Sequence, residues 1–441
     1  MPITGMRLKG FKCFADSGEI PLAPLTVVFG RNNTGKSSIL QSLLLLRQTL
    51  DSPEYGPRLD LRGPLYPAGS YADIVHQHKS KQNIAMLFNV TDIPTHKGAA
   101  RIELEFSSDE PQPARLVGLK VSDGVVEPLE ICRGRGRGGP YELYIGSKSQ
   151  GLEKKAVFRF PQNGFFPLIG PEPPRVGRPN EKHEQSRLFA RLALQALETT
   201  LRSMRAVGAF RRQPDRRYEY QGRVSPAIDA TGRSVVDSLI EDVGRRGNKR
   251  GELFRSVNKW LKEVGRVRLL PFKRISASAR IFEVRLKDTD SGRWANFADV
   301  GFGVGQAFPV FVEGLRTPPG GVFLVQEPEI HLHPDAQLGM ADFLWSLASS
   351  GRHVVVETHS EHLLLRIRRR LMSRKSDQAR LARGDVSILY VTKTPEGTSR
   401  VIPLEIDELA QIRNWPKGFM EEASEERLRL MRQMAKALET E

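Results

Sequence analysis

Cysteine is nearly absent from this sequence, because Cys13 and Cys132 are the only two in 441 residues. They are too few for a disulfide framework or a cysteine-based zinc site, and they suit a reducing interior. Long apolar runs are also missing: none approaches the ~20 residues that span a bilayer, and the N-terminus lacks the basic-then-apolar order of a signal peptide. We therefore expect a cytoplasmic protein with no membrane contact.

Acidic residues are in the minority. The chain has 67 Lys and Arg against 51 Asp and Glu, a formal net charge of +16. This balance favours nucleic acid or another polyanion as a partner. Hydrophobic residues at 39% and charged residues at 27% are ordinary globular values, which exclude wholesale disorder. The length predicts two domains or one elaborated domain.

One stretch matches the phosphate-loop pattern: GRNNTGKSS, residues 30–38. It lies between a predicted strand, LTVVFG, and a predicted helix, SSILQSLLLLRQTL, which is the context that the pattern requires. In such a loop Lys36 neutralises phosphate oxygens and the Ser37 hydroxyl can ligate Mg²⁺. We predict that ATP is bound by Gly30, Asn32, Asn33, Thr34, Gly35, Lys36, Ser37 and Ser38.

Several protein families share this loop, and other motifs in the sequence distinguish among them. A GTPase needs a guanine-reading Asn-Lys-x-Asp, but the nearest stretch, Asn258-Lys259-Trp260-Leu261, lacks the Asp. A small-molecule kinase does not need so long an interval before VQEPEIHLHP, residues 325–334. The interval is natural if a large insertion separates the two halves of an ATP-binding-cassette head.

Four stretches resemble the ABC-type ATPases related to RecF, SMC and OLD-family proteins: LKGFKCF with LTVVFGRNNTGKSSIL, ADVGFGVGQAFP, VFLVQEPEIHLHP and VVVETHSEHLLLRI. Two more are similar to those of AAA-family bacterial predicted ATPases with a short C-terminal domain of unknown function: VGAFRRQPDRRYEY and IPLEIDELAQIRNWPKGFMEE. The matching stretches are distributed over almost the whole chain, although residues 107–180 resemble no family that we recognise.

The resemblance implies a head that binds ATP and Mg²⁺ between two subunits of a homodimer. Lys36 and Ser37 of one protomer would face a signature loop of the other, and His359 would approach the γ-phosphate as a switch. The signature-loop residues implied to contact nucleotide are Gly301, Gly303, Gly305 and Gln306.

Two positions depart from the family pattern. The strand that normally ends in a Mg²⁺-holding acid and then a water-orienting carboxylate ends here in Gln326 and Glu327. A glutamine cannot neutralise charge, and Mg²⁺ prefers anionic oxygen ligands. Gly305 stands where such loops commonly place a serine. We assign Glu327 and His359 as catalytic residues and Ser37 and Gln326 to the metal, and we expect slow hydrolysis.

A rival interpretation treats the acid and histidine cluster as a transition-metal site. Its members would be Glu327, Glu329, His331, His333, His359 and His362. The alternative is that the two middle histidines pack or cap in the turn after the strand, and no H-E-x-x-H spacing supports a dedicated metal site.

Three basic segments also allow two interpretations: RGRGRGG at 133–139, GAFRRQPDRRYEYQGR at 208–223 and RIRRRLMSRK at 366–375. The first is a flexible arm for phosphate backbones or a solvated loop. The second grips a nucleic-acid strand through charge and stacking, or has a structural duty in the head. The third is most simply a solvated helix face.

We expect an α/β fold, an ABC-type P-loop ATPase head with a mixed sheet. The predicted parts are residues 1–106 (first half of the head), 107–280 (a helical, irregular and Arg-rich insertion), 281–384 (second half) and 385–441 (a small α+β C-terminal domain). The predicted function is that of an ATP-hydrolysing dimeric switch, with DNA-related or antiphage roles implied by analogy. The alternative is a nucleotide-gated scaffold without turnover that recruits an effector protein such as a nuclease.

Overall fold

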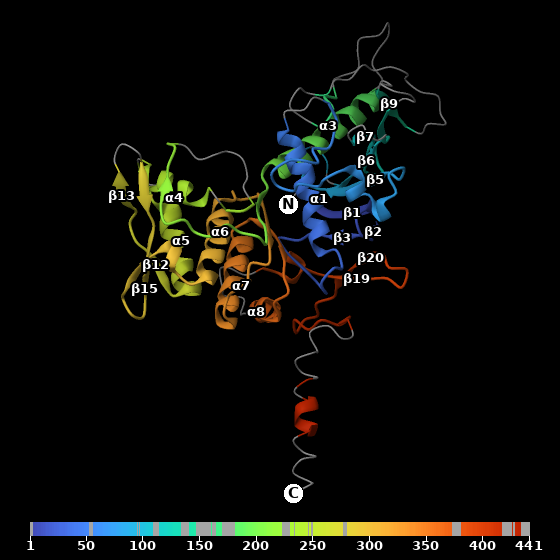
Figure 1. Cartoon of the computed structure of the whole chain (residues 1–441). Coiled ribbons are helices and arrows are strands. Elements are labelled where there is room, and N and C mark those ends of the chain that lie inside the picture. Colours follow the sequence, from blue (N-terminus) through green and yellow to red (C-terminus); the bar gives the residue numbers. More distant parts are fainter. Residues whose placement is uncertain are drawn as a thin grey trace.

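The computed structural model describes most of the chain. The described residues are 3–52, 56–94, 96, 98–108, 114–133, 141–146, 160, 165–169, 181–222, 230–232, 234–245, 247, 250–276, 280–372, 381–416, 426 and 428–433. It confirms the predicted mixed α/β fold (Figure 1).

A six-stranded sheet lies at the centre of the described structure, in the order β10-β17-β18-β4-β19-β20. Neighbouring strands are parallel except for β20, which pairs antiparallel with β19. The central strands read as continuous apolar runs because helices cover both faces of a parallel sheet. The bounds are β10 Arg205–Val207, β17 Val322–Gln326, β18 His353–Glu357, β4 Leu25–Gly30, β19 Val386–Lys393 and β20 Ser399–Leu404.

A second sheet of eight described strands is antiparallel, in the order β2-β1-β5-β6-β7-β8-β9 with β3 beside β1. Apolar and polar residues largely alternate in the segments NIAMLFNV and ARIELEFS, which form β5 and β6. The bounds are β1 Ile3–Phe11, β2 Phe14–Asp16, β3 Ile20–Pro21, β5 Ile84–Val90, β6 Ala100–Ser107, β7 Arg115–Ser122, β8 Leu129–Arg133 and β9 Tyr141–Ile145.

The helices divide between two hydrophobic cores. One core joins the eight-stranded sheet to α1 and α3, and the other joins the central sheet to α4–α8. Figure 1 shows α1 in the middle of the molecule, with α3 and the eight-stranded sheet on one side and α4–α8 on the other. The bounds are α1 Lys36–Asp51, α2 Tyr71–Ile74, α3 Glu181–Arg202, α4 Val235–Gly244, α5 Glu252–Gly265, α6 Phe302–Arg316, α7 Pro334–Ser349 and α8 Glu361–Leu371.

Two small antiparallel sheets lie next to α4 and α5 in Figure 1. Their strands come from the stretch before the helix that carries the predicted signature loop. The bounds are β11 Tyr218–Glu219, β13 Lys273–Ser276 and β14 Ile281–Glu283 in one, and β12 Val267–Leu269, β15 Arg285–Asp288 and β16 Trp294–Asn296 in the other.

The segment predicted as an insertion, residues 107–280, does not stand apart from the head. Strands β7–β9 continue the eight-stranded sheet beyond β6, and β10 pairs with β17 at the edge of the central sheet. On α3, Ala193, Leu194 and Leu197 are buried, whereas Leu188 is 42% exposed. The helical register places Leu188 away from the stripe that faces the sheet.

The C-terminal segment also contributes strands to the central sheet. Strand β19 pairs with β4 over six residue positions, and β20 closes the sheet. Near the end of this segment, residues 426 and 428–433 are described, and they are helical and exposed. No described helix has the length and apolar character needed to cross a membrane.

Candidate nucleotide-binding site

The phosphate loop lies between β4 and α1, as the sequence predicted. Gly30 has a φ of +153°, and a Cβ there would lie 2.4 Å from the Val391 carbonyl oxygen. Gly35 has a φ of +99°, and a Cβ there would lie 2.1 Å from Cys13 Sγ. Both positions therefore require glycine, because a side chain would clash and the backbone is left-handed.

The other predicted loop residues divide by exposure. Asn32 and Asn33 are exposed, with Asn33 at a φ of 63°, a conformation that asparagine tolerates. Thr34 is buried and its hydroxyl donates to the Arg31 carbonyl at 2.9 Å. Ser38 is buried, and its hydroxyl accepts from Cys13 Sγ at 3.8 Å, so this side chain faces the eight-stranded sheet.

Lys36 is folded over the phosphate loop. Its Nζ donates to the Arg31 carbonyl oxygen at 2.9 Å, and only 4% of the residue is exposed. Burial lowers its pKa, and the nearby carboxylates of Glu357 and Glu327 partly offset that effect. An ammonium group held in this way can exchange one carbonyl for phosphate oxygens.

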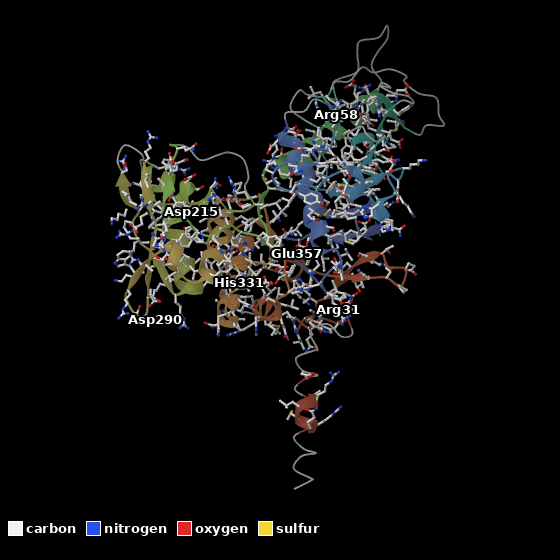
Figure 2. All side chains as sticks on the ribbon, in the orientation of Figure 1. Arg31, Arg58, Asp215, Asp290, His331 and Glu357 are labelled. Atoms are coloured by element: carbon white, nitrogen blue, oxygen red, sulfur yellow. The ribbon has the colours of Figure 1, made fainter. Side chains whose placement is uncertain are left out.

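Ser37 is hydrogen-bonded to a carboxylate from the neighbouring strand. Its Oγ donates to Glu357 Oε1 at 2.6 Å, and Gln326 Nε2 donates to Glu357 Oε2 at 2.8 Å. Glu357 is only 3% exposed, and Figure 2 shows it near the middle of the molecule. Burial raises its pKa, while the bonds from Ser37 and Gln326 and the charge of Lys36 act in the opposite direction.

Sequence reasoning gave Glu357 no role. The signal was present, because VVVE places a carboxylate at the end of a buried strand immediately before the THS motif. Its meaning depends on strand order, which one sequence does not provide: β18 lies between β17 and β4, so Glu357 lies between Gln326 and the phosphate loop.

Glu327 and His359 come together at the same edge of the sheet. Glu327 Oε1 lies 3.8 Å from His359 Nε2, and the two side chains are 32% and 38% exposed. Glu327 has a φ of 44°, and its backbone N–H donates to the Glu357 carbonyl at 2.7 Å. Burial and the charge of Lys36 lower the pKa of His359, whereas the charge of Glu327 raises it. The net effect is a lowered pKa, so the imidazole is neutral at pH 7.

Glu329 holds the loop that carries His359. Its Oε1 accepts hydrogen bonds from the His359 backbone N–H, at 2.8 Å, and from the Thr358 hydroxyl. The residue is 8% exposed, and its Oε2 has no hydrogen-bond partner among the described residues. Burial raises the pKa of this carboxyl group. Its two hydrogen bonds connect the loop after β17 to the loop after β18.

Arg211 joins the end of β17 to the start of α6. Its guanidinium donates to the carbonyl oxygens of Gln306 (3.1 Å), Glu327 (2.9 Å), Gln326 and Gly208. The residue is 7% exposed, and burial lowers its pKa to about 10. This is a structural duty inside the head, one of the two interpretations of segment 208–223.

The neighbouring charges in that segment are also paired within the protein. Arg216 forms a bidentate pair with Asp299, and Arg212 pairs with Asp215. The Tyr218 hydroxyl accepts from the Asp215 backbone N–H at 2.9 Å. These contacts favour the structural interpretation over a strand-gripping surface for this segment.

The predicted signature loop forms the N-terminus of α6, where Gly301 is the N-cap and is exposed. A Cβ on Gly303 would lie 2.5 Å from the His331 carbonyl oxygen. Gly305 is buried, and a Cβ there would lie 3.1 Å from the Pro214 ring, so a side chain at this position would require Pro214 to shift. Gln306 is 3% exposed, so its side chain lies inside the protein.

The histidines after β17 pack and cap. The His331 ring lies 4.6 Å from that of Phe302 in an edge-on contact. His333 is the N-cap of α7, and its Nδ1 accepts from the Asp335 backbone N–H. In the described ranges, no group of three or more His, Cys, Asp or Glu is arranged to hold a metal ion.

The basic face of α8 is partly neutralised. Arg366 and Arg370 both pair with Asp342 on α7, and Arg368 donates to the Ala410 carbonyl. The face is therefore not simply solvated, which corrects the simplest interpretation of segment 366–375. Residues 134–140 and 170–180, which include most of RGRGRGG, lie outside the described residues.

Fold and site together define a P-loop ATPase-type head. A glycine loop between a buried parallel strand and a helix, with its lysine and serine beside carboxylates at the ends of adjacent strands, is the arrangement of that class. The carboxyl edge of a parallel sheet is also where such folds bind ligands.

The chain belongs to the family described as "AAA domain, putative AbiEii toxin, Type IV TA system", whose model matches residues 25–366. A second model, "Protein of unknown function (DUF3696)", matches residues 381–430. The resemblance that the sequence motifs carried is thereby confirmed. A search of curated proteins found no match.

Several solved structures are similar to the chain at low identity. One is an SMC head bound to the C-winged helix domain of ScpA (13% identity, TM-score 0.46, covering 92% of this chain and 99% of that one). The others are the SMC head of Thermotoga maritima (12%, 0.41, 92% and 100%) and that of Pyrococcus furiosus bound to the C-terminal domain of ScpA (13%, 0.43, 91% and 96%).

Proposed function

We propose that this chain is an ATP-binding, slowly ATP-hydrolysing switch that works as a homodimer closed by nucleotide. The convergence of Lys36, Ser37, Glu327 and His359 at one edge of the central sheet carries the proposal. Hydrolysis requires charge neutralisation, a positioned water and a donor near the γ-phosphate. Side chains suited to each of these tasks lie at this edge.

Each residue has a separate task in this proposal. Lys36 releases the Arg31 carbonyl to bind phosphate oxygens, and Glu327, partly exposed, orients the attacking water and accepts its proton. His359, neutral at pH 7, contacts the γ-phosphate side of the site. The oxygen donors around Ser37 suit Mg²⁺, which prefers hard oxygen ligands and, when bound, neutralises the charge of the phosphates.

The test is single-turnover ATP hydrolysis with Mg²⁺ by the full chain, with nucleotide binding and oligomeric state followed in the same samples. We expect wild type to bind ATP, dimerise and turn over slowly. Lys36→Ala should lose ATP binding by about 100-fold or more, since its ammonium is the principal positive charge on the phosphates. Equal ATP binding by wild type and Lys36→Ala would contradict the site.

A second candidate function is a nucleotide sensor that binds and dimerises without turnover. Gln326 at the end of β17 and the buried Gly305 favour it, because each replaces a group that assists hydrolysis in the resembled family. Wild type that binds ATP and dimerises but shows no single-turnover product would establish this alternative.

The dimer proposal rests on the exposed start of α6. Gly301 is exposed and Phe302 is 45% exposed, and a helix N-terminus attracts phosphate. We propose that this end faces the phosphate loop of the second protomer. The buried side chain of Gln306 makes its part structural, whereas Gly301 and Gly303 would offer backbone N–H groups. An ATP-dependent rise in mass by light scattering would support the dimer, and a monomer at saturating ATP would refute it.

The anchoring role of Glu329 leads to a prediction with a built-in control. Glu329→Leu removes the acceptor for Thr358 and His359 and should lower turnover about 10- to 100-fold, as loss of supporting contacts typically does. Glu329→Gln keeps an acceptor oxygen in place and should retain most of the rate. Equal loss in both variants would mean that charge, and not loop position, is what matters.

Glu329→Gln also tests the direction of the pKa shift of Glu329. Because burial raises the pKa of Glu329, the folded protein binds its proton more tightly, and the stability gained is present at low pH and lost as pH rises through the raised pKa. Glu329→Gln lacks this dependence. Its stability relative to wild type, measured by urea unfolding, should therefore increase from about pH 4.5 upward.

We further propose a polyanionic partner, with DNA the first to test, and a separate effector protein such as a nuclease. The net charge of +16 supports the first, and the toxin-antitoxin wording of the matching family agrees with a defence role. Binding of duplex DNA should weaken steeply as salt rises from about 50 to 200 mM. Absence of binding at the lower salt would remove DNA from the proposal.

A further inference from the structure

Glu357 occupies the position at which a metal-holding acid is missing from β17. Strand β18 lies between β4 and β17, and Glu357 pairs with Gln326 across one ladder and with Val28 across the other. The carboxylate that Gln326 cannot provide is thus present one strand nearer to the phosphate loop.

Both oxygens of this carboxylate have defined neighbours. Oε1 accepts from the Ser37 hydroxyl at 2.6 Å and Oε2 accepts from the Gln326 amide at 2.8 Å. Because a carboxylate only accepts hydrogen bonds, the amide nitrogen of Gln326 must face it. Gln326 therefore turns its N–H₂ group toward Glu357, and its carbonyl oxygen lies on the side of Gly208.

We propose that Glu357, with Ser37, supplies the protein ligands for the divalent cation of bound ATP, while Gln326 holds the Glu357 carboxylate in place. The inference rests on the proposed function and reassigns the part of Gln326 within it. Ser37 and Glu357 are hard oxygen donors already 2.6 Å apart, and such donors suit Mg²⁺. A second positive charge beside Lys36 would also offset the burial of Glu357.

Glu357→Gln distinguishes a metal-binding role of Glu357 from a merely structural one. Glu357→Gln keeps the shape of the side chain, an acceptor oxygen and a donor group, so a hydrogen-bonding duty between Ser37 and Gln326 would survive it. A metal-binding duty would not, because the anionic oxygen is lost. The carboxylate also repels phosphate when no cation is present, so the effect on ATP affinity should depend on Mg²⁺.

The experiment measures the affinity of the full chain for a fluorescent ATP analogue in EDTA and in excess Mg²⁺. Wild type should bind more tightly with Mg²⁺. In Glu357→Gln this enhancement should fall about 10- to 100-fold, the usual cost of disturbing a metal site, while affinity in EDTA is unchanged or improved. Electron paramagnetic resonance of Mn²⁺ bound with ADP should show weaker Mn²⁺ retention by the same variant.

Gln326→Glu supplies the opposite change. A second carboxylate beside Glu357 should lower affinity in EDTA and increase the Mg²⁺ enhancement, and this variant carries the test if thermal unfolding shows that Glu357→Gln does not fold. If either variant folds and Mg²⁺ increases its ATP affinity as much as it does in wild type, the inference is overturned and the proposed function stands. Wild type that binds no nucleotide in either condition overturns the proposed function, and the inference with it.

Discussion

Glu327→Gln is expected to slow single-turnover ATP hydrolysis about 100-fold or more, the usual contribution of a positioned general base. ATP binding should persist, because Lys36 and the loop backbone remain. The expectation follows from the position of the residue: its carboxylate is partly exposed, faces His359 and is held by a left-handed backbone whose N–H bonds to the Glu357 carbonyl. A glutamine there can still accept a hydrogen bond from water, but it cannot take the proton.

The measurement is quenched-flow hydrolysis with excess enzyme, beside equilibrium ATP binding and light scattering. Glu252→Gln is a suitable control, since Glu252 is an exposed carboxylate in the first turn of α5 and belongs to neither loop. We expect the Glu327 variant to accumulate as an ATP-bound dimer. Hydrolysis at the wild-type rate in Glu327→Gln would transfer the general-base role elsewhere in the site.

Arg211→Met should lower the free energy of unfolding by about 3 kcal/mol or more, because each buried acceptor left without a donor costs about 1–3 kcal/mol. Four carbonyl oxygens accept from this guanidinium, those of Gly208, Gln306, Gln326 and Glu327, and of these the Glu327 oxygen also accepts from the Ile330 backbone N–H. Arg211→Lys should also be destabilising, since a single ammonium cannot reproduce the planar fork.

Urea unfolding of the two variants, with Arg216→Met as the matched control, tests this expectation. Arg216 pairs with Asp299 at the surface and is 69% exposed, so its removal should cost less than about 1 kcal/mol. If Arg211→Met were as stable as Arg216→Met, the bonds from Arg211 to the site loops would be of little consequence. ATP binding by Arg211→Lys would then also match wild type.

The local parts of the site were predictable from the sequence. The phosphate loop is recognised by its glycine spacing between a predicted strand and a predicted helix. Glu327 and His359 each follow an apolar strand in a recognisable motif. The structure places both motifs at one edge of the sheet because β17 and β18 are parallel neighbours. Each motif lies within one short segment, so its residues could be named from the sequence alone, and their role at the site stays a prediction.

The remaining parts depended on which segments pair. Glu357 gained its position from the strand order, and Gln306 is inside because α6 buries that face against Arg211. Strands β7–β9 are short segments of eight, five and five residues within a stretch that matched no recognisable motif, so the sequence alone did not assign them. Pairing with β6 supplies the missing order, and tertiary contact overrides weak local preference.

The position of β4 between β18 and β19 limits how early the central sheet can fold during synthesis. The phosphate-loop strand β4 lies far upstream of both of its hydrogen-bonded neighbours, β18 and β19. Pairings so distant in sequence form late and slowly. A nascent chain that has reached only the phosphate loop therefore lacks the sheet that shapes this loop, and the proposed site can form only after β18 and β19 have been made.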